Sequence, residues 1–406
     1  MKVLQVNVVY EYGSTGKIVA DIHKVLIEEG IQSIVCYGAG PCVSDSNIYK
    51  IVKGHEPGIN SRWAKYTGLQ YASGFLSTFR LIKIIKNEKP DIVHLHCING
   101  FFVHIYYLLR FLKRKRIKTV ITLHAEFMYT GSCGHAFDCE KWKTGCGDCP
   151  QLWDATYSKY FDRTATAWKK MKKAFKNFDE LTVTCVSPWV YSRAKQAPIL
   201  KGKKMVTIEN GLDSKEIFYP RPFQDLKESL GIKNEKIILH VTANFSARED
   251  DLKGGRFLYK LADNLINDNV KIIIIDGKGN TGIDLLANMI DVGRVKDQKV
   301  LAQFYSMADL TVVTSKKETF NMPVAESLAC GTPVVGFKAG GPETISIKEY
   351  SEFVDYGDVE ALTLCARKWL EYKTQKGPDI SKTAREYYSK EKMCMRYLEV
   401  YKSMLE

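Results

Sequence analysis

The sequence predicts an α/β protein with two doubly wound parallel-sheet domains, and three observations support this. The chain has 406 residues, enough for two or three domains, and 45% of them are apolar, as in ordinary globular cores. Short β-branched runs alternate with longer helical patterns, which is typical of βαβ units and parallel sheets. The alternation restarts after Pro220, in a Pro-containing segment at 218–223, so we expect a hinge there.

The expected elements follow this alternation along the chain. The first domain should span 1–220, with strands at 2–9, 32–38, 91–97, 118–124 and 180–187 and helices at about 16–30 and 101–115. The second should span 221–382, with strands at 236–244, 270–277, 308–315 and 332–337 and helices from about Gly254 and Pro323. Apolar residues at helical spacing predict one final helix at 383–406, expected to pack back on the N-terminal domain.

Composition and charge narrow the possible functions. The apolar content excludes disordered and fibrous proteins, and the absence of a long apolar run or a signal-like start predicts a cytosolic protein. The formal charge is +13, and the whole excess lies in residues 1–220, where 32 Lys and Arg oppose 19 Asp and Glu. Such a field attracts anions, whether nucleic acid, anionic membrane or phosphorylated substrates, although it also simply favours solubility.

Ligands of doubly wound domains bind at the carboxyl ends of the strands. The first such loop, at 10–17, contains Gly13 and Gly16, which let backbone N–H groups approach an anion at a helix N-terminus. The loop matches neither GxGxxG nor the P-loop spacing, so a plain tight turn explains it about as well.

A second loop pattern follows the strand at 308–315. Glu318 lies in the loop and Glu326 falls one turn into the next helix, whose N-terminus offers backbone amides suited to a diphosphate; that N-terminus comprises Asn321, Met322, Pro323 and Val324. Carboxylates accept hydrogen bonds from hydroxyls, so the site suits a sugar beside a phosphate. Alternatively, Glu326 is a helix-dipole partner and Glu318 a solvated charge.

Two cations complete this pattern. Arg248 and Lys253 follow the strand at 236–244 and can point into one crevice, where they would neutralise a departing diphosphate. Arg248-x4-Lys253 followed by Glu318-x7-Glu326 resembles the retaining, nucleotide-sugar-dependent glycosyltransferases of the two-Rossmann GT-B architecture, in the large family (family four) that includes sucrose and mannosyl transferases. The resemblance spans nearly the whole chain and also rests on Gly13, Gly16, His124, Ser187-Pro188-Trp189 and Asn210-Gly211-Leu212-Asp213.

The resemblance implies two Rossmann-like domains facing across a cleft and a hexosyl transfer with retention, in which a leaving phosphate oxygen acts as the base and no catalytic metal takes part. It implies that the diphosphate is bound by Arg248 and Lys253, the donor sugar by Glu318 and His124, and the ribose by Glu326. From residue type alone, His124 would instead be a packed core histidine. Ala125-Glu126 departs from the expected His-Asp pair, so either Glu126 replaces that carboxylate or His124 is oriented differently.

Four of the eleven cysteines fall within a Gly-rich insert at 131–150: Cys133, Cys139, Cys146 and Cys149. Four thiolates satisfy a tetrahedral Zn²⁺ and would staple a segment that has little core of its own. We therefore predict a structural zinc; His135 could replace one sulfur, and free thiols or a disulfide remain alternatives. The insert resembles one in exopolysaccharide-type, colanic-acid-like glycosyltransferases, which implies surface-glycan assembly.

Two basic clusters lie in the first domain, at 113–118 and 169–176, and an apolar stretch at 101–109 precedes the first of them. A solvated helix face over an ordinary core is the default interpretation. Because acceptors in this setting are commonly lipid-linked diphosphates, we also expect peripheral docking on an anionic membrane at the cytoplasmic face of the inner membrane.

The sequence thus predicts a glycosyltransferase that moves a sugar from a nucleoside diphosphate to a lipid-linked or other glycan acceptor, with no nucleic-acid partner. Base recognition is expected at 291–303. Two alternatives remain: a GT-B-fold nucleotide-sugar epimerase, which needs no acceptor, and a zinc-containing nucleic-acid-binding protein, which would explain the cysteines and the charge.

Overall fold

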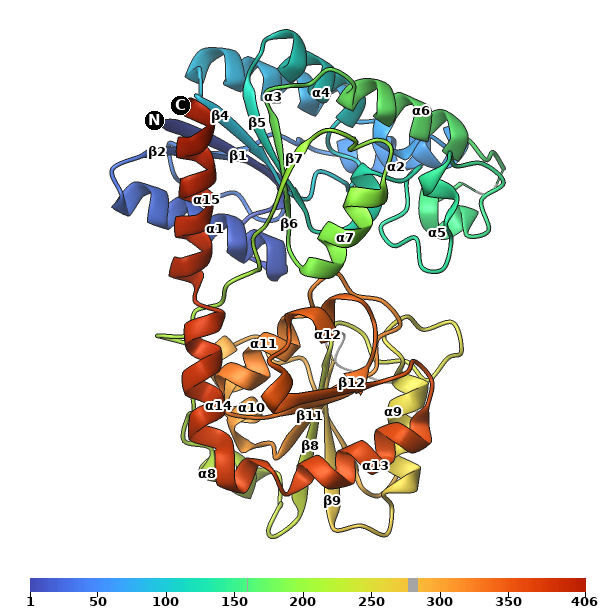
Figure 1. Ribbon diagram of the computed structural model, residues 1–406, viewed down its shortest axis with the longest axis vertical. Coiled ribbons are helices and arrows are strands. Elements are labelled where there is room, and N and C mark those ends of the chain that lie inside the picture. Colours follow the sequence, from blue (N-terminus) through green and yellow to red (C-terminus); the bar gives the residue numbers. More distant parts are fainter. Residues whose placement is uncertain (159, 277–283) are drawn as a thin grey trace. The chain divides into compact units, whose positions relative to one another are not determined.

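The computed structural model describes residues 1–158, 160–276 and 284–406. The chain forms two compact units: a first unit of residues 1–209 with 393–406, and a second unit of residues 210–392 (Figure 1). The division follows Glu209 and therefore precedes the predicted hinge at Pro220. Its position is explained by Gly211, where an added Cβ would lie 2.5 Å from the Lys390 Cα, so that this turn packs closely within the second unit.

The first unit is built on a parallel sheet of seven strands in the order β3-β2-β1-β4-β5-β6-β7. The strands are β1 (Lys2–Val9), β2 (Gln32–Ala39), β3 (Ile48–Lys50), β4 (Ile92–Leu95), β5 (Lys118–Leu123), β6 (Leu181–Cys185) and β7 (Lys204–Thr207). The helices are α1 (Gly13–Glu28), α2 (Glu56–Thr67), α3 (Phe75–Glu88), α4 (Ile105–Arg114), α5 (Leu152–Thr156), α6 (Thr164–Phe175) and α7 (Pro188–Gln196). Short 3₁₀ turns lie at Gln70–Ala72, Glu126–Met128 and Lys141–Lys143.

The second unit repeats the design with six parallel strands in the order β10-β9-β8-β11-β12-β13. The strands are β8 (Lys236–Thr242), β9 (Val270–Asp276), β10 (Met289–Gly293), β11 (Leu310–Val313), β12 (Val334–Phe337) and β13 (Ser351–Val354). The helices are α8 (Gln224–Ser229), α9 (Gly255–Asn264), α10 (Gln298–Met307), α11 (Met322–Ala329), α12 (Gly341–Ile345), α13 (Val359–Leu370) and α14 (Lys373–Tyr387), with a 3₁₀ turn at Lys348–Tyr350. Two parallel α/β sheets confirm the predicted fold class.

The end of the chain differs from the single helix predicted at 383–406. A break at Tyr388 and Ser389 separates α14 from α15 (Lys390–Leu405), because the backbone there pairs with Leu212 instead of continuing the helix. The Leu212 amide donates to the Tyr388 carbonyl (2.9 Å), and the Tyr388 hydroxyl donates to the carbonyl of Ile345 (2.7 Å). Only 393–406 therefore joins the first unit.

α15 is held to the first sheet by apolar packing and by two buried hydroxyls. Tyr397 and Tyr401 are fully buried in a cluster that includes residues of α1 and β1. The Tyr401 hydroxyl lies 2.6 Å from Nδ1 of His94 on β4, and the Tyr397 hydroxyl lies 3.2 Å from Thr122 on β5. The last helix thus completes the core of a unit whose other residues lie almost two hundred positions earlier.

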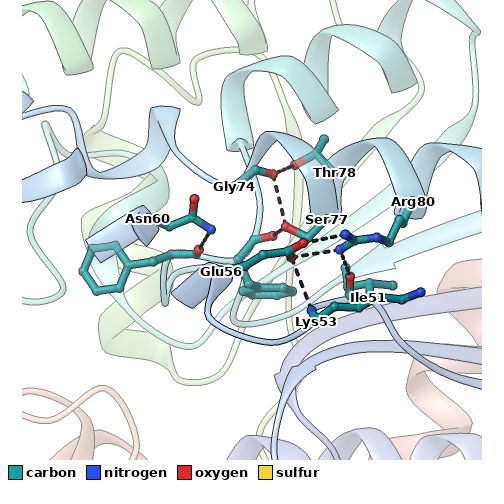
Figure 2. A network of polar contacts seen from close by, with 10 residues as sticks. Ile51, Lys53, Glu56, Asn60, Gly74, Ser77, Thr78 and Arg80 are labelled. Atoms are coloured by element: carbon teal, nitrogen blue, oxygen red, sulfur yellow. Dashed lines mark hydrogen bonds and ion pairs between the residues drawn. The ribbon is translucent and has the colours of Figure 1, made fainter. Parts of the chain in front are cut away.

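Polar contacts fix α2 and α3 to each other, as Figure 2 shows. Arg80 on α3 donates to both carboxylate oxygens of Glu56 at the start of α2 (2.8 and 2.5 Å) and to the carbonyl of Ile51 (2.8 Å). Asn60 on α2 donates to the carbonyl of Phe101 (2.8 Å). These bonds tie α2 and α3 to the loop that precedes α4.

Among the described residues, no helix combines the length and apolar character needed to cross a membrane.

We predict that Tyr401→Phe lowers the unfolding free energy of the first unit by about 1–2 kcal/mol, because it leaves the buried His94 nitrogen without its partner. Thermal or urea unfolding measures the loss. Tyr66→Phe is the matched control, since Tyr66 on α2 is 62% exposed. Equal stability of Tyr401→Phe and the control would contradict the role given to this hydroxyl.

Candidate functional site

In the second unit, the loops that follow β8, β11 and β12 meet at one edge of the sheet, because these three strands are adjacent and parallel. Lys253, in the loop after β8, places Nζ 2.5 Å from Oε1 of Glu318, in the loop after β11. The Glu318 carbonyl accepts from the Gly341 amide (2.8 Å), which joins the loop after β12 to the same group. The structure thus brings together Lys253 and Glu318, two of the residues singled out in the sequence.

The helix predicted near Pro323 begins at Met322, with Pro323 in its first turn. Asn321 precedes it with a left-handed backbone (φ 79°), so the chain turns sharply from the Glu318 loop into α11. Val324 is buried in the same first turn. The N-terminal backbone amides of α11 therefore begin directly after the loop that holds Glu318.

Glu326 lies one turn further along α11 and accepts a hydrogen bond from the hydroxyl of Tyr305 on α10 (2.9 Å). Burial, with a smaller contribution from the charge of Glu326, raises the pKa of Tyr305 well above its usual value. Tyr305 therefore stays a neutral donor and orients the carboxylate.

Arg248 lies in the loop after β8 but does not join the Lys253–Glu318 pair. Its guanidinium forms a two-bond ion pair with Asp250 (2.9 and 2.5 Å), and its side chain is 76% exposed. The sequence suggested that both cations point into one crevice; in the structure the neighbouring carboxylate of Asp250 keeps Arg248 at the surface of the loop.

Sequence reasoning missed two parts of this edge. Tyr305 belongs to another helix and follows no motif. The short helix α12, which follows the loop after β12, contains Glu343, whose carboxylate accepts from the amides of Ala339 (2.9 Å) and Gly340 (2.8 Å) in that loop. A Cβ on Gly341 would lie 2.5 Å from the Thr319 carbonyl carbon, so glycine alone allows this close approach. The Gly340-Gly341-Pro342 run after a strand was the available signal.

The segment 291–303, where base recognition was predicted, spans the end of β10 and the first half of α10. Asp297 caps α10, since its carboxylate accepts from the Lys299 amide (2.8 Å).

In the first unit, the 10–17 loop, His96 and His124 follow the adjacent strands β1, β4 and β5 and so share one edge. α1 begins at Gly13 (φ 65°), and the Gly16 carbonyl accepts from the Glu11 amide (3.1 Å), which closes the loop as a tight turn.

His124 is 8% exposed, and its Nε2 lies 3.2 Å from Nδ1 of His96. Burial lowers the pKa of His124 to about 4, so the ring is neutral near pH 7.

Glu126 supports the loop after β5. Its carboxylate accepts from Arg193 of α7 (2.5 Å), the Tyr129 hydroxyl (2.8 Å) and the Ala136 amide (2.7 Å). These three partners come from α7, from the segment just before the Cys-rich insert and from the insert itself. The carboxylate thus serves as a structural brace, and this differs from the proposal that it replaces the carboxylate of a His-Asp pair.

The four cysteines of the insert line one small cavity together with Trp142 and Thr164. The Cys133 thiol donates to Cys149, which lowers the pKa of Cys149 to about 7 and raises that of Cys133. Burial raises the pKa of Cys146 to about 11. As placed, no three His, Cys, Asp or Glu side chains in the described part of the chain are arranged to hold a metal ion.

The basic clusters and the apolar stretch of the first unit separate into core and surface. Phe102, Ile105, Tyr106, Leu108 and Leu109 are buried core residues, whereas Tyr107 is 40% exposed. Lys113 donates to the carbonyls of Lys173 (3.2 Å) and Lys176 (2.8 Å), and so caps the end of α6.

An exposed apolar group nevertheless lies beside the lysines. On α3, Phe75, Leu76 and Phe79 are 47, 61 and 52% exposed, and Phe79 packs edge-on against Tyr107 with 5.7 Å between ring centroids. Phe75 packs against His104. Burial is the main reason why the pKa of His104 is lowered to about 4, and the positive charges of Lys170 and Arg110 act in the same direction. We name the set Phe75, Leu76, Phe79, Tyr107, Arg110 and Lys170 the α3–α4–α6 face.

Comparison with known proteins identifies both halves of the chain. Residues 15–216 match the model of Glycosyltransferase Family 4, and residues 223–387 match that of Glycosyl transferases group 1. The putative colanic acid biosynthesis glycosyl transferase WcaC of Escherichia coli is 21% identical, over all of this chain and all of its own.

Solved structures share the fold. Sucrose-phosphate synthase of Thermosynechococcus elongatus superimposes with a TM-score of 0.69 at 16% identity and covers 100% of this chain and 99% of its own. HepE of Anabaena, solved in complex with UDP-glucose, has a TM-score of 0.66 at 15% identity, and the match covers 99% of this chain and 100% of HepE. The two family models together account for both parallel-sheet units, and the chain therefore belongs to the family-four glycosyltransferases of the GT-B fold.

Proposed function

We propose that the chain transfers a sugar, with retention, from a nucleoside diphosphate to a glycan acceptor during surface-polysaccharide assembly. The observation that carries this proposal is the Lys253–Glu318 pair directly before the N-terminus of α11. The relative named for colanic acid biosynthesis supports the polysaccharide setting, and the neighbour solved with UDP-glucose supports a nucleotide-sugar donor. The epimerase and nucleic-acid-binding alternatives gain no support from these comparisons.

The donor chemistry follows from charge. Breaking the anomeric C–O bond leaves negative charge on the nucleoside diphosphate and positive charge on the sugar ring. Lys253 and the first amides of α11 stabilise the departing diphosphate, and Glu318 faces the sugar, where its carboxylate accepts from hydroxyls and favours the developing positive charge. Glu326, oriented by Tyr305, accepts from the ribose.

Arg248 joins the diphosphate by exchanging partners. Its present pair with Asp250 is exposed to water, and screened ion pairs of this kind contribute little. A diphosphate carries more charge than one carboxylate and offers several oxygens to the same planar fork. Exchanging Asp250 for a diphosphate therefore costs Arg248 little free energy. Donor binding would draw the loop after β8 toward the phosphates.

Retention follows if the acceptor hydroxyl attacks from the face that the phosphate leaves. The leaving phosphate oxygen then takes the hydroxyl proton, so no side chain has to form a covalent intermediate. His124 contacts the donor sugar in this scheme, and the turn that contains Gly13 and Gly16 offers backbone N–H groups at the start of α1 to an anionic part of the donor.

For the acceptor, we propose a lipid-linked glycan that the chain meets while docked on an anionic membrane through the α3–α4–α6 face. Exposed Phe75, Leu76 and Phe79 suit the boundary between headgroups and acyl chains, and nearby basic side chains suit anionic headgroups. Lys169, Lys170 and Lys173 on α6 are exposed and extend this positive surface.

For the Cys-rich insert, we propose a structural zinc held by Cys133, Cys139, Cys146 and Cys149. The support is that all four thiols line one cavity and that Cys149 ionises easily. Binding would replace the Cys133–Cys149 hydrogen bond by thiolate ligation and draw the four sulfurs to a common centre. The metal would hold the insert next to Glu126 and take no part in transfer.

Glu318→Gln and Arg248→Ala should each lower turnover of a nucleoside-diphosphate sugar roughly 100-fold, the scale of removing one preorganised electrostatic group. Steady-state kinetics with the donor identified by a thermal-shift screen provides the measurement. Glu360→Gln and Arg367→Ala on α13 are the controls, and both should keep full rate. Full activity in either site variant would remove that residue from the site.

Reversing the charge of Lys169, Lys170 and Lys173, or replacing Phe75 and Phe79 by Ser, should abolish co-sedimentation with anionic liposomes at low salt, whereas neutral liposomes should retain little protein. Reversal of Lys24, Lys201 and Lys204, also exposed in the first unit, is the control. Co-sedimentation of both α3–α4–α6 variants with anionic liposomes at the wild-type level would contradict the docking proposal.

Purified wild-type protein should contain about one zinc per chain by elemental analysis, and Cys149→Ser should lose the metal and unfold at lower temperature. Cys42→Ser, at an exposed cysteine outside the insert, should keep both properties. Metal-free wild-type protein of unchanged stability after expression with added zinc would rule the site out.

A further inference from the structure

A chain of buried polar contacts leads from α1 to His124. The Gln5 side-chain amide on β1 donates to the backbone carbonyl of Val19 on α1 (3.3 Å). Gln5 Oε1 lies 3.2 Å from Nε2 of His96, and Nδ1 of His96 lies 3.2 Å from Nε2 of His124. Gln5 and His96 are 0 and 1% exposed. The ring of His94 packs against that of His96 with 3.8 Å between the centroids and a 37° tilt, which restricts how the His96 ring can turn.

The donor and acceptor of each hydrogen bond between Val19, Gln5, His96 and His124 can be deduced. The Val19 carbonyl only accepts, so the nitrogen of Gln5 faces it and the Gln5 oxygen faces His96. That oxygen also only accepts, so His96 carries its proton on Nε2. Burial lowers the pKa of His96 well below its usual value, and the ring is neutral with a lone pair on Nδ1.

His124 must therefore donate to His96 from Nε2. A neutral imidazole has one N–H, so the Nδ1 of His124 carries the lone pair. The opposite tautomer would set two lone pairs against each other between buried rings, an arrangement that a buried site penalises.

We propose that Gln5 and His96 are positioning residues that fix His124 as the Nε2-protonated tautomer and so hold its ring in one orientation for contact with the donor sugar. This rests on the proposed function, in which His124 contacts the sugar. The fixed tautomer explains how His124 keeps one orientation while Glu126 serves as a brace for the insert.

The test combines a spectroscopic and a kinetic measurement on the full chain. Long-range ¹H–¹⁵N spectra of ¹⁵N-histidine-labelled protein report the tautomer, and the His124 signals are assigned by their loss in His124→Gln. Gln5→Leu removes the amide at similar size. Gln70→Leu makes the same change at another buried glutamine of the first unit and is the matched control.

We expect Nε2-protonated His124 in the wild type and in Gln70→Leu. In Gln5→Leu we expect a mixture of His124 tautomers. We expect kcat to fall tenfold or more and the donor KM to stay within about twofold, because the substitution changes only which nitrogen of His124 carries the proton. Nδ1-protonated His124 in the wild type would overturn the proposal, as would an unchanged tautomer and kcat in Gln5→Leu.

If Gln5→Leu does not fold, the wild-type spectrum alone decides the tautomer. Failure of the wild type to turn over any nucleoside-diphosphate sugar would count against the proposed function, and the tautomer would still be judged by the spectrum.

Discussion

Parallel strands all end at the same edge of their sheet, and the arrangement of both candidate edges depends on this constraint. In the second unit it brings together loops that are 65 residues apart, so that Lys253 meets Glu318 at 2.5 Å and the Gly340-Gly341 turn packs against the same loop. In the first unit it places His96 and His124 side by side at the ends of β4 and β5. Neither edge depends on a long sequence motif.

The two edges have opposite electrostatic character. The edge of the second unit carries an ion pair, a second cation on a surface loop and a helix N-terminus, which suits charge that develops on a diphosphate. The edge of the first unit carries buried neutral imidazoles whose protons are distributed by hydrogen bonding. A neutral acceptor suits a sugar hydroxyl. The roles proposed for the two edges rest on this difference in burial and charge.

The sequence predicted what local patterns determine. β-branched runs located the central strands of both sheets but missed the edge strands β3, β7, β10 and β13, which have few neighbours to bury such residues. Pro323 marked the start of α11. Contacts between distant segments could not be predicted in this way. Tyr305 orients Glu326 from another helix, Leu212 breaks the final helix at Tyr388, and Asp250 captures Arg248 because an exposed guanidinium takes the nearest carboxylate. The relay from Gln5 to His124 joins three strands and leaves no trace in spacing.

The central claim is that Lys253, paired with Glu318 beside α11, holds the phosphates of a nucleotide sugar. Calorimetric titration of a panel of nucleoside diphosphates into the wild type and Lys253→Met tests it most directly. The account predicts that at least one diphosphate binds the wild type and binds Lys253→Met roughly tenfold or more weakly, since one charged hydrogen bond to phosphate is lost. Equal affinity in the two proteins, or no binding of any nucleoside diphosphate to the wild type, would contradict it.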